Sequence, residues 1–261
     1  MSADFTVASW NVNSLKVRLP QVLDWLAAHP VAVLGLQETK LTDDKFPHAQ
    51  LQQAGYHALC SGQPTYNGVA LLSRAAAEDV LLDPPGLDDA QRRIIAATYG
   101  ELRVINLYVV NGKAVDDEKY HYKLDWLRRI EDWLASELQQ HSKLIVMGDF
   151  NIAPGDDDVH DPAAWQDRIL CSTPERERLQ ALFDLGLVDT FRLFPRDGKQ
   201  FSWWDYRQAA FRRDLGLRID LVLASHALAK NCVSSAIDQT PRRLQRPSDH
   251  APVMATFNLD W

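Results

Sequence analysis

Carboxylates, carboxamides, one phenol and one imidazole stand at or just beyond the ends of short apolar runs. The residues concerned are Asn11, Glu38, Tyr108, Asn111, Asp149, Asn151, Asp249 and His250. Burying such groups is costly unless they are paired or bound to a metal. A single one, such as Asn11, is usually a cap or turn residue. If the runs are strands of adjacent sheets, however, their ends can converge, and the sequence then predicts a pocket that holds Glu38, Asp149 and Asp249 with two amides and one imidazole.

Such a pocket favours Mg2+ or Mn2+ over zinc, because carboxylate and amide oxygens are hard ligands. The sequence has no HExxH motif and no Cys/His cluster, and it lacks the GxSxG, GxxxxGK[ST] and GxGxxG patterns of acyl transfer, NTP binding and dinucleotide binding. A magnesium ion polarises a phosphoryl oxygen, a carboxylate can deprotonate water, and a histidine beside a carboxylate can pair with phosphate as a cation. The residues therefore predict metal-dependent phosphoester hydrolysis.

Charge is unevenly distributed along the chain. The 28 Lys and Arg residues are outnumbered by 35 Asp and Glu residues, which gives a formal net charge of −7. Residues 149–161 hold five aspartates and no Lys or Arg, whereas residues 207–218 and 242–246 are rich in arginine. Each cluster alone is equally well interpreted as a solvated loop. Together, basic loops around an acidic centre favour a polyanion that is held around a cation.

The overall composition is that of a globular protein, since 46% of the 261 residues are hydrophobic and 24% are charged. No apolar stretch approaches the ~18 residues of a membrane span, and the N-terminal residues do not form a secretory signal. Cys60, Cys171 and Cys232 lie far apart, which fits a reducing compartment. We therefore expect a cytoplasmic protein with no membrane partner.

Short apolar runs rich in β-branched residues predict strands. They cover residues 5–10, 31–36, 68–73, 93–98, 102–109, 144–148, 219–224 and 252–257. Helical periodicity predicts helices at about residues 15–28 and 117–139, and Pro174-Glu175 opens a third. Several strands follow one another without an intervening helix. That order disfavours a parallel doubly wound sheet and favours mixed sheets that pack on one another with helices outside.

Five ordered motifs resemble the endonuclease/exonuclease/phosphatase superfamily. They are Ser9-Trp10-Asn11-Val12-Asn13, Leu36-Gln37-Glu38-Thr39-Lys40, Gly148-Asp149-Phe150-Asn151, Arg218-Ile219-Asp220 and Ser248-Asp249-His250. The segments at residues 187–192, 201–207 and 216–220 resemble the exonuclease III-type apurinic/apyrimidinic endonucleases in particular. The resemblance extends from Phe5 to Phe257. It implies a single domain over residues 1–261 with an α/β fold, a four-layer α/β/β/α sandwich of two mixed β-sheets packed face to face.

The resemblance also implies an activity and its cofactor. The activity is hydrolysis of phosphodiester bonds at abasic sites in duplex DNA, with 3′-5′ exonuclease and 3′-phosphodiesterase or phosphatase activity beside it. The cofactor is Mg2+, for which Mn2+ can substitute, and the partner is double-stranded DNA with abasic sites or 3′ ends, bound by a monomer. The implied metal-site residues are Asn11, Glu38, Asp149, Asn151, Asp249 and His250, with Glu38 as the main ligand.

Roles for single residues follow from the same resemblance. Asp149 would orient or deprotonate the attacking water, and Asn151 would hydrogen-bond the phosphate and that water. His250 would contact the phosphate while Asp220 orients its ring, and Tyr108 would contact the phosphate or assist the leaving group. The residues that would contact DNA are Trp203, Trp204 and Leu217, around a flipped abasic sugar, and Lys40, Arg92, Asn111 and Arg218, at phosphates.

Alternative interpretations stay open for the chain and for single residues. A relative that acts on inositol phosphates or phospholipids would share the metal site, although the aromatic segment at residues 201–206 and the arginine-rich loops favour DNA. A nucleic-acid-binding protein on a decayed nuclease fold should lack some of the residues that the chemistry needs. All six of these are present: Glu38, Asp149, Asn151, Asp220, Asp249 and His250. Trp203 and Trp204 could instead be core residues, and Arg92 could lie on a solvated face.

Overall fold

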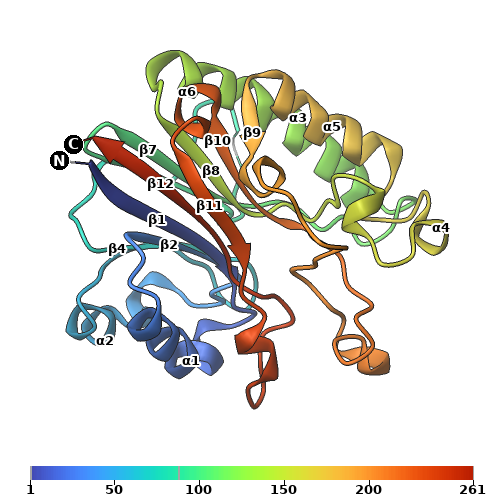
Figure 1. The fold of residues 1–261 in the computed structure, drawn as a ribbon, viewed down its shortest axis with the longest axis horizontal. Coiled ribbons are helices and arrows are strands. Elements are labelled where there is room, and N and C mark those ends of the chain that lie inside the picture. The colour runs from blue at the N-terminus through green and yellow to red at the C-terminus, as the bar shows by residue number, and fades with distance from the viewer. Residues whose placement is uncertain (1, 88, 261) are drawn as a thin grey trace.

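The computed structural model describes residues 2–87 and 89–260. Twelve strands in this part of the chain form two sheets of six (Figure 1). The first has the order β11 (Cys232–Ile237), β12 (Val253–Asp260), β1 (Ser2–Asn11), β2 (Val33–Gln37), β4 (Val69–Ser73) and β3 (His57–Ser61). The second has the order β5 (Glu78–Leu81), β6 (Ile94–Tyr99), β7 (Leu102–Tyr108), β8 (Leu144–Asp149), β10 (Asp220–Ser225) and β9 (Leu187–Asp189).

Both sheets are mixed. In the first, β1 runs parallel to β2 and antiparallel to β12; in the second, β7 runs parallel to β8 and the other pairs are antiparallel. The β-branched and aliphatic residues of the interior strands are buried on both faces, as strands between two layers must be. The predicted mixed topology is confirmed.

The alternation of side chains along the strands separates three apolar layers. In β1, Val7 packs into the core between the sheets, whereas Ala8 and Trp10 face the opposite side. In β8, Ile145 and Val146 divide in the same way between the intersheet core and the outer core. Each sheet thus buries one face against the other sheet and one face against helices.

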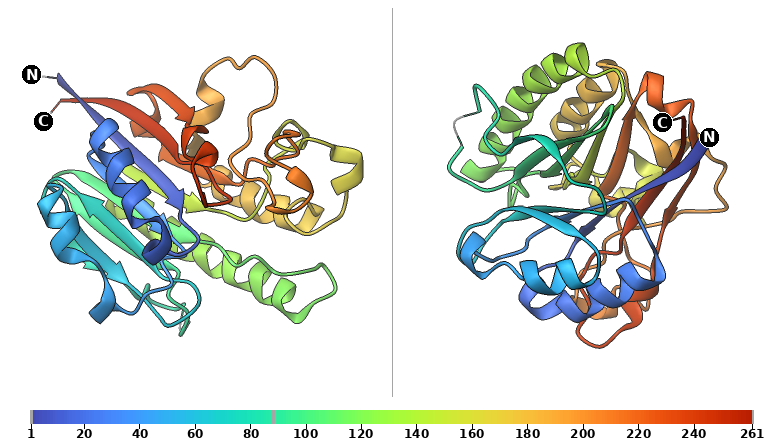
Figure 2. Two further views of the ribbon diagram at one scale, coloured as in Figure 1. Left: turned by 90° about the horizontal axis from the view of Figure 1, so that it is seen from below. Right: turned by 90° about the vertical axis from the view of Figure 1, so that its left-hand side faces the viewer.

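The helices cover the two outer faces (Figures 1 and 2). On the first sheet lie α1 (Leu15–Ala28) and α2 (His48–Gln53), whose Val22 and Leu51 join the core around Trp10. On the second lie α3 (Glu118–Gln140) and α5 (Thr173–Asp184), whose Ile130 and Leu182 join the core around Val146. The predicted four-layer α/β/β/α sandwich is confirmed. Two short helices, α4 (Pro162–Trp165) and α6 (His226–Ala229), lie in connections, as do five 3₁₀ turns. None of the helices in residues 2–87 and 89–260 combines the length and apolar character needed to cross a bilayer.

The strands that the sequence analysis missed are the four edge strands, β3, β5, β9 and β11. Two of them carry several exposed residues: β5 is exposed at its first three positions, and β11 at three of six. An edge strand packs on fewer neighbours and needs no continuous apolar run, so it leaves a weak signal in the sequence.

Candidate active site

The register of the interior strands brings the predicted polar residues to one end of both sheets. Asn11 ends β1 opposite Gln37, the residue before Glu38, in β2. In the second sheet, Asp149 at the end of β8 lies opposite both Tyr108 and Asp220. Gly148 permits this close approach, because a Cβ there would lie 1.9 Å from Leu107 O. The convergence predicted from the sequence is therefore present.

Asn11 connects the carboxylates of the two sheets. Its Oδ1 accepts the backbone N–H of Asn13 at 3.0 Å, so its Nδ2 faces Glu38 Oε1 at 3.0 Å and Asp149 Oδ2 at 2.9 Å. Tyr108 donates its hydroxyl to the same Glu38 Oε1 at 2.9 Å. Lys40 Nζ lies 2.9 Å from Glu38 Oε2. Glu38 is thus the most connected carboxylate on the first-sheet side of the site.

A second set of contacts holds Asp249 beside this centre. Asn13 donates to Asp249 Oδ1 at 3.0 Å and accepts from Lys40 Nζ at 2.6 Å, so it connects the two motifs. Trp203 Nε1 donates to Asp249 Oδ2 at 3.0 Å. Asn13 was not among the predicted site residues, although its position two residues after Asn11 in the Ser9–Asn13 motif was a signal.

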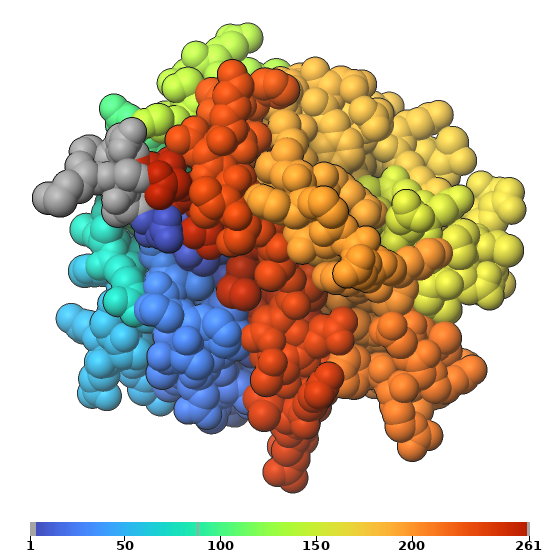
Figure 3. Space-filling model, viewed as in Figure 1, coloured from blue at the N-terminus to red at the C-terminus, as the bar shows by residue number. Residues whose placement is uncertain are grey.

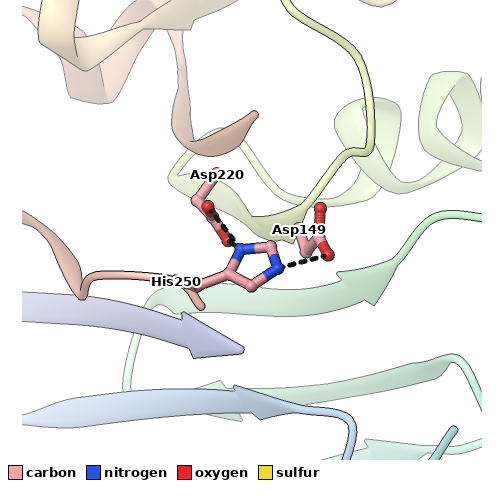
Figure 4. Close-up of side chains that lie close together, drawn as sticks. All are labelled: Asp149, Asp220 and His250. Atoms are coloured by element: carbon pink, nitrogen blue, oxygen red, sulfur yellow. Dashed lines mark hydrogen bonds and ion pairs between the residues drawn. The ribbon is translucent and has the colours of Figure 1, made fainter. Parts of the chain in front are cut away.

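Asp220, His250 and Asp149 form a row in which His250, from the loop before β12 of the first sheet, lies between Asp220 and Asp149 of the second sheet (Figure 4). His250 Nδ1 lies 2.9 and 3.1 Å from the two oxygens of Asp220, and its Nε2 lies 3.7 Å from Asp149 Oδ2. The ligand atoms of the three residues lie within 4.8 Å of one another, and all three residues are buried. Both oxygens of Asp220 thus lie within hydrogen-bond distance of the imidazole Nδ1, the contact that the predicted orienting role requires.

Burial and the neighbouring charges shift the pKa values of the row. Burial lowers the pKa of His250, but the carboxylates of Asp220 and Asp149 outweigh it and raise the pKa to about 10. Burial raises the pKa of Asp149 to about 7, against the lowering influence of His250. The carboxylates thus favour the imidazolium form of His250 while no metal is bound, and an imidazolium can donate a hydrogen bond to a phosphate oxygen. The place of His250 in the metal site stays a prediction.

Burial and neighbouring groups also shift the pKa values of Glu38, Asp249 and Tyr108. Burial raises the pKa of Glu38, but Lys40 and the hydrogen bond from Asn11 lower it below its ordinary value. Burial also raises the pKa of Asp249, and His250 and Trp203 bring it below its ordinary value. Burial and the charge of Glu38 hold the pKa of Tyr108 well above 10, so the phenol stays neutral and can donate a hydrogen bond.

Four residues of the site have a left-handed backbone. Asn13, Glu38, Lys40 and Asn151 have φ values of 43°, 51°, 54° and 50°. This region is sparsely populated by residues other than glycine, and non-glycine residues that occupy it cluster at functional sites. Their side chains all enter the hydrogen-bond network described here.

Asn151 and Asn111 extend the site beyond β8. Asn151 Nδ2 donates to Asp149 Oδ2 at 3.2 Å and to Val109 O at 3.0 Å, and Asn111 Nδ2 donates to Asn151 Oδ1 at 2.9 Å. Asn151 is buried, whereas Asn111 is exposed. The pair therefore reaches from the buried acids to the surface.

The predicted DNA-contacting residues divide into two groups. Lys40, Asn111 and Trp203 lie in the network just described. Arg92 lies apart: its side chain is 38% exposed and pairs with Asp83 at 2.8 Å.

The other three predicted DNA contacts are buried, and we correct their assignment. Arg218 is 1% exposed, and its guanidinium pairs with Asp158 at 2.6 Å and Asp189 at 2.7 Å, so it is not available to a phosphate. Trp204 and Leu217 are each 0% exposed. Trp204 Nε1 donates to Asp214 at 3.1 Å, and Leu217 pairs with Trp203 through its backbone. These three residues lie behind the wall of the site. Of the predicted DNA contacts with an aromatic or apolar side chain, only Trp203 reaches an acid of the site, Asp249.

Comparison with known proteins agrees with this geometry. The profile of the Endonuclease/Exonuclease/phosphatase family matches residues 8–250. This chain belongs to that family. It is 36% identical over 262 residues to exodeoxyribonuclease III of Haemophilus influenzae, and the match covers 95% of this chain and 98% of that protein.

Two solved structures extend the comparison. The 3′ phosphatase NExo from Neisseria, bound to a product DNA hairpin, superposes with a TM-score of 0.95 at 50% identity and covers 98% of this chain and 100% of its own. An AP endonuclease from Archaeoglobus fulgidus superposes with a TM-score of 0.94 at 36% identity, with the same coverage. The predicted family and fold are confirmed, and the phosphodiester hydrolase class is the class of these relatives.

Proposed function

We propose that this protein is a metal-dependent DNA repair nuclease that hydrolyses phosphodiester bonds at abasic sites in duplex DNA and trims 3′ ends. The observation that carries the proposal is the buried row of Asp220, His250 and Asp149 beside Glu38 and Asp249. It combines an imidazolium that can contact phosphate with a carboxylate that can accept a proton near neutral pH. Relatives named for exonuclease, 3′-phosphatase and AP endonuclease activities support the substrate.

The donor set fits a hard divalent cation. Four carboxylates, Glu38, Asp149, Asp220 and Asp249, face two cations, Lys40 and His250, so the buried cluster carries excess negative charge. Burial is the main cause of the raised pKa of Asp149, and the negative charge of Asp220 adds to it. Glu38, Asp149 and Asp249 would hold Mg2+ or Mn2+, and Asn11 and Asn151 lie within reach of the same carboxylates. When bound, the cation polarises the phosphoryl oxygens and neutralises charge on the leaving oxygen.

Side chains of the protein would transfer the proton, contact the phosphate and receive the sugar. Asp149, at 1% exposure, accepts the proton of the attacking water while the amide of Asn151 fixes its orientation. His250, held by Asp220, offers its Nε2–H to a phosphate oxygen. The neutral hydroxyl of Tyr108 is a hydrogen-bond donor for the phosphate or the leaving oxygen. Trp203 forms the apolar side of the site, where an abasic sugar would enter.

The surface around the site suits duplex DNA. Arginines that are exposed lie in two segments that project from the same end of the molecule, around residues 210 and 245 (Figure 3). They are Arg207, Arg212, Arg213, Arg243 and Arg246. Tyr206 joins the two segments by donating to Pro247 O at 2.8 Å. Such basic groups attract the phosphate backbone, whatever the sequence.

A second candidate is an enzyme that trims 3′ ends without cutting internal abasic sites. The higher identity to the Neisseria 3′ phosphatase and 3′-5′ exonuclease, 50% against 36% for the archaeal AP endonuclease, favours it. In either case we propose that residues 1–261 act as one domain and as a monomer.

One assay separates the candidates. Matched duplexes with an internal abasic site, an intact strand, or a 3′-phosphate at a nick are incubated with Mg2+ or with EDTA. Mg2+-dependent incision at the abasic site supports the first proposal, and release of 3′-phosphate without incision supports the second. Cleavage of none of them, or equal cleavage in EDTA, refutes both.

Selectivity gives a further prediction. Trp203→Ala should reduce the ratio of cleavage efficiencies on abasic and intact duplexes, because the apolar side of the site excludes a sugar that carries a base. Trp203 also donates a hydrogen bond to Asp249, a proposed metal ligand, so its loss could disturb the metal site as well. Trp203→His keeps an N–H donor and is the control for that effect. Equal loss of both activities in the alanine variant would place Trp203 in a supporting role only. All arms use one salt concentration, since phosphate contacts make affinity salt-dependent.

A further inference from the structure

A fully buried lysine joins two helices to the loops of the site. Lys123 in α3 and Glu175 in α5 both have side chains that are 0% exposed, and Lys123 Nζ donates to the Glu175 carboxylate. The same Nζ donates to the backbone carbonyls of Asn151 at 2.7 Å and Asn111 at 3.2 Å. An ammonium has three N–H donors, and these three acceptors use all of them.

The two carbonyls belong to the two amides of the site. Asn111 and Asn151 are joined by their side chains, and Asn151 in turn contacts Asp149. Asn151 has a left-handed backbone, with φ of 50°, a conformation that persists only when its surroundings hold it. Lys123 holds the carbonyl of that residue, while Asp149 Oδ1 accepts its backbone N–H at 2.9 Å.

Glu175 is itself held rigidly. Its carboxylate accepts the backbone N–H of Leu170 at 3.1 Å and of Ser172 at 3.1 Å, and the hydroxyl of Ser172 at 2.7 Å. The bond from the Ser172 backbone N–H belongs to the capping box that starts α5. The start of α5 therefore fixes Glu175, Glu175 fixes Lys123, and Lys123 fixes the two site loops.

We infer that Lys123 and Glu175 are positioning residues, which hold the amides of Asn151 and Asn111 where the substrate phosphate and the attacking water meet Asp149. This inference rests on the proposed function. Stability alone is a weak reason for such a pair, because a buried ion pair is often no more stabilising than apolar residues of similar volume. The lysine directs its other donors at the carbonyls of both site loops, which a purely stabilising pair would not require.

The protein contains a matched control. Arg103 and Glu137 form another buried ion pair, at 2.8 Å, and Glu137 also lies in α3. Arg103 is five residues before Tyr108 along β7, which places it about 17 Å from the site end of that strand. The test compares Lys123→Met/Glu175→Gln with Arg103→Met/Glu137→Gln. Each double variant removes one buried cation and neutralises its partner while the glutamine keeps an acceptor oxygen.

Three quantities are measured for each variant: the thermal midpoint, kcat and KM on the duplex that the wild type cleaves in Mg2+, and DNA affinity in EDTA. We expect the Lys123/Glu175 variant to lose about 10- to 100-fold in kcat, the range known for residues that support a metal site from outside. KM and affinity in EDTA should stay within about twofold of the control variant, because the phosphate-binding arginines are untouched. The control variant should share any fall in midpoint but keep its kcat.

Equal kcat in the two variants would overturn the inference. Should the Lys123/Glu175 variant not fold, Glu175→Gln alone is compared with Glu137→Gln, and a kcat no lower than that of Glu137→Gln overturns it as well. A wild-type protein that cleaves none of the duplexes refutes the proposed function instead. In that case the chemical shift of the Asn151 side-chain amide still tests the positioning: it should change in the Lys123/Glu175 variant and not in the control, and an unchanged shift counts against the inference.

Discussion

Replacing Asp220 with asparagine removes the principal carboxylate that faces His250. Asp220 is buried, and the amide has nearly the same size and shape as the carboxylate that it replaces. The packing around residue 220, and with it the fold, should therefore be retained. What changes is charge. Asp220 contacts His250 Nδ1 at 2.9 and 3.1 Å and is the largest of the influences that raise the pKa of the imidazole.

The magnitude follows from the pKa of His250. A rise from 6.5 to about 10 corresponds to about 5 kcal/mol in favour of the imidazolium. Burial opposes this rise, and without Asp220 only Asp149 and Asp249 remain to offset it. We therefore expect the pKa of His250 to fall to neutrality or below in Asp220→Asn. At pH 7.5 the ring then loses its charge, and kcat should fall by about 10³- to 10⁴-fold, as with the comparable change in a serine-protease triad.

The pH dependence of stability has a definite sign. Because the folded-state pKa of His250 is raised, its contribution to stability is fully present below pH 6.5 and is lost as the pH rises through about 10. Asp220→Asn should show little of this loss. The wild type and the variant would be unfolded in urea at intervals between pH 6 and pH 10.5, in EDTA.

The direct assay is NMR titration of labelled histidine side chains, with kcat measured over the same pH range. Asp189→Asn is the control, since Asp189 is also buried and charge-paired but contacts Arg218 instead of His250. A His250 titration near pH 10 in both the wild type and Asp220→Asn would refute the reasoning. So would full additivity between Asp220→Asn and His250→Asn, because residues that act as a unit are not additive in their effects on rate.

Further predictions test the acids and the corrected arginine. Glu38→Ala should raise the Mg2+ concentration needed for half-maximal activity by at least about tenfold while DNA affinity in EDTA stays near wild type, and an unchanged Mg2+ dependence would exclude Glu38 as a ligand. In EDTA, the raised pKa of Asp149 should make stability fall as the pH rises from about 4 to about 7, because the folded protein keeps a proton that the unfolded chain releases. Mg2+ should therefore raise the thermal midpoint more at pH 8 than at pH 5, where protons compete for the same carboxylate, and equal shifts would contradict this. Arg218→Met should lower the free energy of unfolding by about 3–5 kcal/mol without changing DNA affinity per folded molecule, since it removes the ion-pair partner of buried Asp189 and leaves Asp158 with Arg192 alone. Lost affinity at unchanged stability would restore Arg218 as a phosphate contact.

The interior strands and their polar ends were predictable because burial on two faces leaves a strong pattern. A strand between two layers must be apolar along its length, so the first polar residue marks its end. Asn11, Glu38 and Asp149 were found in this way, and the register of β1, β2 and β8 brings them together. The edge strands leave no such pattern, and the same physical difference explains why they were missed.

The buried charges could not be placed from the sequence. Lys123 lies in α3 between Tyr120 and Trp126, on the face that the helix buries. From the sequence alone, a lysine in a helix is ordinarily interpreted as exposed to solvent. Its partner Glu175 is 52 residues away, and the partner of Arg218 at Asp158 is 60 residues away. Sequence periodicity shows which face of an element is buried, but not which distant charge will compensate another. The prediction of Arg218 as a phosphate contact followed from the resemblance, and no pattern in the sequence pointed to its partners Asp158 and Asp189.

The backbone of the site shows why such distant contacts matter. A non-glycine residue with a left-handed backbone costs about 1–3 kcal/mol, so it must be held by its surroundings. Around Glu38 and Lys40, backbone hydrogen bonds supply this hold: Ser14 N donates to Glu38 O at 2.8 Å, and Lys40 N donates to Asn67 O at 2.9 Å. Asn151 lies just after the end of β8, and side chains hold its backbone. Its carbonyl is instead held by Lys123, its N–H by Asp149 Oδ1 at 2.9 Å. A helix thus supplies a cation on both sides of the site: Arg18 of α1 donates to the carbonyl of Asn13 at 2.5 Å, and Lys123 of α3 donates to that of Asn151. Only Lys123 is fully buried, so its loss cannot be made good by water, and substitutions at Lys123 should disturb the chemistry more than substitutions at Arg18.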